Sequence, residues 1–130
     1  MLVVDANVAV AAARVPDGFT ALGSDRLVAP PLMWSEALSA LHEAVWRGEL
    51  PARAAELTRT RLESAPLEAR SPARLGHEAW RIADELGWAK TYDAEYLALA
   101  RILGCRFATL DGRLRRGAAR LGFVVSPAEL

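Results

Sequence analysis

Two aspartates in this sequence each follow directly on a short apolar run. Asp5 ends the run at residues 2–4, and Asp111 ends the run at residues 107–110. Such runs are typical of strands in a parallel sheet, which is buried on both faces. A carboxylate at the end of a buried strand costs free energy unless a metal ion or a helix N-terminus offsets its charge. Carboxylate oxygens suit hard cations such as Mg²⁺ and Mn²⁺.

Helix capping is the alternative interpretation of these aspartates, because a predicted helix follows each one. Two of them at strand ends favour a shared site, since ligands bind beyond the carboxyl ends of parallel strands. Asp93 begins an apolar predicted helix and is open to the same N-cap interpretation. Glu36 lies about 200° around its predicted helix from Trp34. That side faces away from the apolar stripe, where a glutamate is usually solvated.

The elements that must position these acids alternate along the chain between strands and helices. We predict strands over 2–4, 26–29, 67–69, 107–110 and 123–125, and helices over 8–14, 33–47, 51–64, 71–86, 93–103 and 112–121. This alternation predicts an α/β fold whose parallel strands are joined by right-handed crossovers. The sequence shows no repeat, low-complexity tract or linker, so we predict one domain over residues 1–130.

Composition narrows the function classes. The 130 residues are 52% hydrophobic and 25% charged, which is a globular balance. A net charge of zero argues against a polycation that coats nucleic acid. Cys105 has no cysteine partner in the sequence, and the isolated His42 and His77 offer no zinc cluster. No signal peptide or apolar run of about 18 residues is found, so we expect a cytoplasmic protein with no membrane contact.

The acidic residues stand in four segments that together resemble a known family. These segments are VVDAN at 3–7, APPLMWSE at 29–36, TYDAEYLALA at 91–100 and TLD at 109–111. In order and spacing they are similar to the four motifs of PIN domains, and they span nearly the whole chain. The short length resembles the VapC-type toxin ribonucleases of type II toxin–antitoxin systems. One departure is Ala6, where many relatives carry a hydroxyl residue.

The resemblance implies a three-layer α/β/α sandwich around a mostly parallel sheet of four to five strands. It implies that Mg²⁺ or Mn²⁺ is held by the catalytic carboxylates Asp5, Glu36, Asp93 and Asp111. It further implies an endoribonuclease that hydrolyses RNA phosphodiester bonds, with a VapB-like antitoxin as partner and a homodimer as assembly. Asn7 and Thr109 match polar positions near the metal site of the family, so we expect them to support the carboxylates.

Basic and aromatic residues are the candidates for holding RNA. Arg113, Arg116 and Arg120 fall on one face of the helix predicted over 112–121, close in sequence to Asp111. They could contact the phosphate backbone, or form an ordinary solvated face. Unpaired bases could stack on aromatic side chains, which could equally be core or dimer contacts: Trp46, Trp88 and Tyr92. For the antitoxin, we predict a groove on the apolar surface of the helices at 51–64 and 74–86.

Two other function classes remain open at this point. A PIN-like domain could bind RNA or protein without cutting, although a scaffold gains nothing from four mutually repelling carboxylates. A phosphoryl-transfer enzyme on a doubly wound sheet fits less well. An aspartyl phosphatase needs a second aspartate two residues after the first, where Asn7 stands, and a receiver domain needs a lysine that Lys90 does not match.

Overall fold

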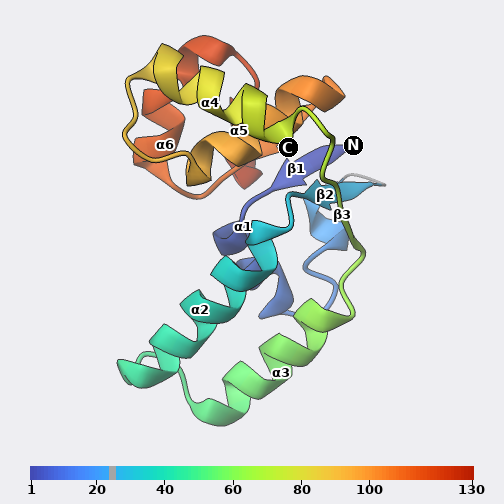
Figure 1. Cartoon of the computed structure of the whole chain (residues 1–130). Helices are drawn as coiled ribbons and strands as arrows, with labels where there is room; N and C mark the ends of the chain where they lie inside the picture. Colours follow the sequence, from blue (N-terminus) through green and yellow to red (C-terminus); the bar gives the residue numbers. More distant parts are fainter. Residues whose placement is uncertain (24–25) are drawn as a thin grey trace.

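The fold is described from a computed structural model, which covers residues 1–23 and 26–130 (Figure 1). Its strands are β1 (Leu2–Val4), β2 (Leu27–Ala29), β3 (Leu67–Ala69), β4 (Arg106–Ala108) and β5 (Val124–Val125). Its α-helices are α1 (Ala6–Ala13), α2 (Leu32–Trp46), α3 (Ala52–Glu63), α4 (Leu75–Leu86), α5 (Tyr92–Leu103) and α6 (Gly112–Gly117). Short 3-10 turns lie at Thr20–Leu22, Ala119–Leu121 and Pro127–Glu129.

The five strands form one parallel sheet in the order β3-β2-β1-β4-β5. This confirms the predicted α/β class and places β1 at the centre. The sheet also brings the carboxyl ends of β1 and β4 next to each other, with Val4 paired to Ala108. Receiver domains have the strand order 2-1-3-4-5. The observed order therefore excludes that alternative.

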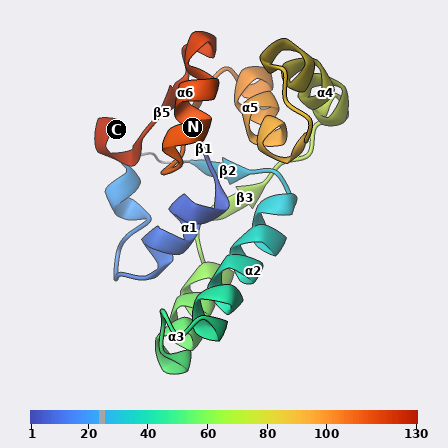
Figure 2. The same ribbon diagram turned by 90° about the vertical axis from the view of Figure 1, so that its left-hand side faces the viewer.

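Helices cover both faces of the sheet, which confirms the three-layer arrangement (Figures 1 and 2). The helices α1, α2 and α3 lie on one side, and α4, α5 and α6 lie on the other. Side chains of β1 alternate between two apolar clusters, as expected of a strand buried on both faces. Val3 packs with Leu97 and Phe107, whereas Leu2 and Val4 pack with Val8.

The predicted helix over 112–121 is wrong in its second half. The α-helix ends at Gly117 and a 3-10 turn follows at Ala119–Leu121. Glycine is a poor helix former, and the indole of Trp88 lies 3.4 Å from the place where a Cβ of Gly117 would stand. Arg120 therefore does not continue the face of α6, and its guanidinium donates instead to the backbone oxygen of Glu85.

The two helices that were predicted to form one apolar groove do not lie together. The α3 helix packs against α1 and α2, whereas α4 packs against α5 on the other side of the sheet (Figure 1). The two helices therefore share no groove. An apolar pocket of about 650 Å³ lies instead between α2 and α3, where its lining includes Leu38, Leu41 and Val45. Within the described part of the chain, none of the helices has the length and apolar content to cross a membrane.

Candidate active site

Asp5 lies at the carboxyl end of β1 and is 7% exposed. Its Oδ1 accepts a hydrogen bond from the backbone N–H of Val8 at 2.9 Å, so Asp5 is the N-cap of α1. Its Oδ2 accepts a hydrogen bond from the Thr109 hydroxyl at 2.5 Å. Burial raises the pKa of Asp5, and the negative charges of Asp93 and Asp111 raise this pKa further.

Thr109 joins the ends of the two central strands. Its side chain is completely buried just after β4. While its hydroxyl donates to Asp5, the same oxygen accepts the backbone N–H of Asp111 at 3.0 Å. Thr109 therefore holds Asp5 and supports the turn that presents Asp111.

Asp111 is exposed and is the N-cap of α6. Its Oδ1 accepts from the backbone N–H groups of Arg113 at 2.9 Å and Leu114 at 3.1 Å. The N-cap interpretation is thus confirmed for Asp5 and Asp111. Capping does not exclude a ligand site, since each residue caps its helix with one of two carboxylate oxygens.

Asp93 lies in the first turn of α5 and is not its N-cap, because Thr91 holds that position. The capping alternative for Asp93 is therefore wrong. Its pKa is raised by partial loss of water around the carboxylate and by repulsion from Asp111. Its carboxylate is exposed, and that side chain lines the same pocket as Asp111.

Glu36 is half-buried on α2, so the predicted solvated face is not what surrounds it. Its Oε1 accepts a hydrogen bond from the Tyr96 hydroxyl at 2.5 Å. Tyr96 is 1% exposed, and its ring stacks on Phe107 of β4 with centroids 5.6 Å apart. Burial, followed by the bond to Glu36, raises the pKa of Tyr96, so its hydroxyl remains a donor. Tyr96 is missing from the sequence prediction, although its place three residues after Asp93 puts both on one side of α5.

Three of the four predicted acids meet in one pocket of about 720 Å³, which we call the carboxylate pocket. It is lined by Glu36, Asp93 and Asp111 together with Gly87, Trp88, Ala89, Lys90, Tyr92, Arg113 and Leu114. Asp5 does not line it, but interacts electrostatically with Asp93 and Asp111. Asn7 is exposed and lines a neighbouring depression of about 390 Å³ that shares Asp111.

Only one member of the predicted arginine stripe lines the carboxylate pocket. Arg113 does so directly after Asp111, whereas Arg116 and Arg120 do not. The prediction that Arg113, Arg116 and Arg120 share one helical face is therefore wrong, because α6 ends at Gly117, before Arg120. Lys90 lines the pocket as well, and the sequence interpretation attached no site role to it.

The carboxylate pocket offers oxygen donors and excess negative charge. Across residues 1–23 and 26–130, none of the ion pairs includes Asp5, Glu36, Asp93 or Asp111. Over the same residues, no three acidic, histidine or cysteine side chains stand close enough to enclose one ion. Mg²⁺ keeps several waters and uses one or two carboxylates. The donor set therefore fits a largely hydrated Mg²⁺ or Mn²⁺ rather than a fully enclosed ion.

Comparison with known proteins decides the family. The PIN domain family model matches residues 2–120. The chain belongs to the PIN domain family. Proteins with a PIN domain are typically nucleases and usually bind a divalent metal. The resemblance predicted from the four acidic segments is thereby confirmed at the level of the family.

Solved structures show how closely this PIN domain keeps the family fold. The crystal structure of PAE2754 from Pyrobaculum aerophilum is 24% identical, with a TM-score of 0.73 over 98% of this chain and 91% of that one. A toxin–antitoxin complex from Klebsiella pneumoniae contains a chain that is 17% identical, with a TM-score of 0.67 over 98% of both. No curated protein sequence gave a match.

Proposed function

We propose that this PIN domain is a Mg²⁺- or Mn²⁺-dependent endoribonuclease that hydrolyses RNA phosphodiester bonds. The observation that carries the proposal is the meeting of Glu36, Asp93 and Asp111 in the carboxylate pocket. The raised pKa values of Asp5 and Asp93 support it, since burial and then the neighbouring acids make it costly to hold these carboxylates charged. A bound divalent cation would offset that charge.

Each carboxylate has a place in this proposal. Asp5, Glu36 and Asp93 would hold the cation directly or through water, and Asp111 would orient the attacking water or hold a second cation. When bound, a divalent cation supplies Lewis-acid polarisation of the phosphate and a lower pKa for water. The remaining work is positioning: Thr109 holds Asp5, and Tyr96 holds Glu36.

Cleavage of RNA by the purified full chain tests the nuclease proposal. We expect cleavage with Mg²⁺ or Mn²⁺ and none with a chelator. Asp93→Asn should lower the rate on the order of 100-fold, because it removes a metal-site charge while leaving the cap of α5 intact. Asp84→Asn on the exposed side of α4 is the matched control. Equal cutting by wild type and Asp93→Asn would overturn the proposal, and metal-independent RNA binding without cutting would favour the silent alternative.

We further propose that the chain is the toxin of a VapBC-type pair, acting in the cytoplasm as a homodimer with a VapB-like antitoxin. Similarity to a chain in a toxin–antitoxin complex over 98% of both chains supports this role. Induced expression should arrest growth, Asp93→Asn should not, and co-expression of the protein encoded next to it should restore growth. Normal growth with soluble, RNA-cutting protein present would contradict the toxin role.

A further inference from the structure

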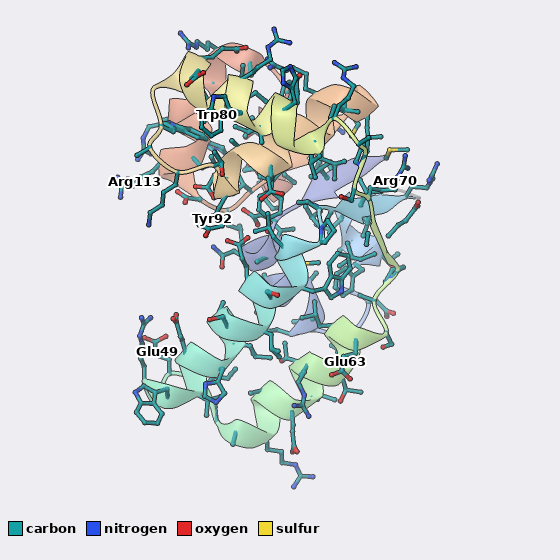
Figure 3. All side chains as sticks on the ribbon, in the orientation of Figure 1. Glu49, Glu63, Arg70, Trp80, Tyr92 and Arg113 are labelled. Carbon is teal, nitrogen blue, oxygen red and sulfur yellow. The ribbon has the colours of Figure 1, made fainter. Side chains whose placement is uncertain are left out.

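One wall of the carboxylate pocket has no part in the chemistry proposed above. It is formed by the segment between α4 and α5 and by the first residues of α5 and α6, and we call it the aromatic wall: Trp88, Lys90, Tyr92 and Arg113. Tyr92 and Arg113 lie on the same side of the molecule (Figure 3). The wall therefore places two aromatic and two basic side chains beside three acids.

The two aromatic residues of the wall differ in burial. Trp88 is half-buried, packs against the main apolar cluster and touches Gly117 of α6. Trp88 therefore fixes the segment to the rest of the fold. Tyr92 is 60% exposed within the pocket. An exposed ring of this kind can serve as a platform for an unpaired nucleobase, because every base has an aromatic face.

The two basic residues of the wall are exposed, and no ion pair among residues 1–23 and 26–130 includes either of them. Other arginines of the described residues do form ion pairs, for example Arg101 with Glu78 at 2.6 Å. Lys90 and Arg113 therefore keep their charge available next to the proposed cleavage centre. Lysine and arginine donors of this kind bind phosphate oxygens.

We propose that the aromatic wall binds one unpaired nucleotide of single-stranded RNA beside the scissile phosphate. The base stacks on Tyr92, and the adjoining phosphate accepts hydrogen bonds from Lys90 and Arg113. A base within a duplex is already stacked on its neighbours, so paired RNA does not fit this wall. The inference rests on the proposed function for the substrate being RNA, and adds which part of the pocket holds it.

Binding of a short unstructured RNA to the full-length Asp93→Asn chain in Mg²⁺ tests the stacking contact. Because Asp93→Asn is expected to cleave RNA much more slowly, the measurement reports binding without cleavage. Fluorescence anisotropy should show about tenfold weaker binding for Tyr92→Leu, because one base–aromatic stack is lost. Tyr92→Trp should bind as tightly as the background chain. Trp80→Leu is the matched control, since Trp80 is 67% exposed and does not line the carboxylate pocket.

The salt dependence of binding tests the phosphate contacts. Each of Lys90→Gln and Arg113→Gln should reduce the slope of log K against log salt by about 0.7, the value for one phosphate contact on a single strand. Arg53→Gln on α3 is the control and should leave the slope unchanged. The same RNA annealed to its complement should compete poorly.

Several results would overturn this inference while leaving the nuclease proposal standing. One is equal binding by Tyr92→Leu and Trp80→Leu. Another is a duplex that binds as tightly as the single strand. A third is that the wall variants weaken only the capture of a co-expressed partner protein. Absence of metal-dependent cleavage by the wild type would instead overturn the proposed function. Tyr92-dependent RNA binding would survive that result, so the two failures are distinguishable.

Discussion

Asp5 uses its two carboxylate oxygens for two different tasks. One oxygen caps α1 through the N–H of Val8, and the other accepts the hydroxyl of Thr109. The local pattern of an acid before a helix predicts the first task, whereas the second depends on a residue that is 104 positions away. Glu36 is a similar case, because its partner Tyr96 is 60 positions away and comes from another helix.

Tyr96→Phe should impair RNA cleavage more than it impairs folding. The change removes the only hydroxyl described as donating to Glu36 but keeps the ring that stacks on Phe107. We expect about a tenfold higher Mg²⁺ requirement, since residues that orient metal-site ligands commonly have effects of this size. The free energy of unfolding should fall by only about 1 kcal/mol.

Magnesium titrations of initial cleavage rates, beside chemical denaturation of the same samples, measure both quantities. Tyr92→Phe provides the matched loss of a hydroxyl from an exposed tyrosine of the same helix. An unchanged Mg²⁺ requirement in Tyr96→Phe would show that Glu36 needs no help from this bond.

At the scale of elements, α5 connects the site with the rest of the α4–α5 layer. Its first turn carries Asp93, its next turn carries Tyr96, and its last turn carries Arg101. Arg101 reaches Glu78 of α4, which is 7% exposed and has its Oε2 without a hydrogen-bond partner. The pKa of Arg101 is raised by its hydrogen bonds to Glu85 and Glu78. This ion-pair cluster ties α4 to α5.

Arg101→Met should lower the free energy of unfolding by about 2 kcal/mol. Removing one partner leaves the buried Glu78 short of its closest cation, at 2.6 Å. The cost stays below that of a completely buried pair, because Arg101 is 30% exposed and Arg74 and Arg81 remain within 4 Å of Glu78.

Urea denaturation checks this value, with Arg47→Met as the control. Arg47 makes an exposed pair with Glu43 at 3.8 Å, so its loss should cost less than about 0.5 kcal/mol. If both variants lose the same free energy of unfolding, the burial of Glu78 does not make its ion pair with Arg101 more important than an exposed pair. Adding Glu78→Leu to Arg101→Met should recover part of the lost stability, because the unpaired charge is gone.

At the scale of the whole molecule, the fold class, the parallel sheet and all five strands were predictable from the alternating pattern. Asp5 and Asp111 could also be predicted to lie at the same edge of the sheet, because both follow the carboxyl ends of parallel strands. That β1 and β4 are direct neighbours is seen only in the structure. Two predictions failed for different reasons. The break of α6 follows Gly117, a poor helix former that is visible in the local sequence. The predicted groove failed because α3 and α4 pack on opposite sides of the sheet (Figure 1), and local periodicity carries no information on which side a helix takes.

Mg²⁺ should stabilise the folded chain, and should do so more strongly at neutral than at acidic pH. Asp5 and Asp93 have raised pKa values in the folded state. At a pH between the ordinary aspartate pKa of about 4 and these raised values, the chain takes up protons as it folds. As the pH rises through this range, the contribution of Asp5 and Asp93 to the free energy of unfolding therefore falls. Above that range the ion finds deprotonated carboxylates and binds best.

Melting temperatures with Mg²⁺ and with a chelator, at about pH 5 and pH 8, test this expectation. At about 100 times its Kd, the ion contributes about 2.7 kcal/mol. Asp93→Asn should show a smaller Mg²⁺ shift at the higher pH, and potassium at equal ionic strength should give none. An identical Mg²⁺ shift at both pH values would contradict the involvement of these carboxylates.

The bond between Thr109 and Asp5 joins two residues that are 104 positions apart, and β1 gains its second neighbour only when β4 is available. A nascent chain on the ribosome therefore presents Asp5 well before the strand that leads to its hydrogen-bond partner. The proposed nuclease site is incomplete in such a chain until β4 has joined β1.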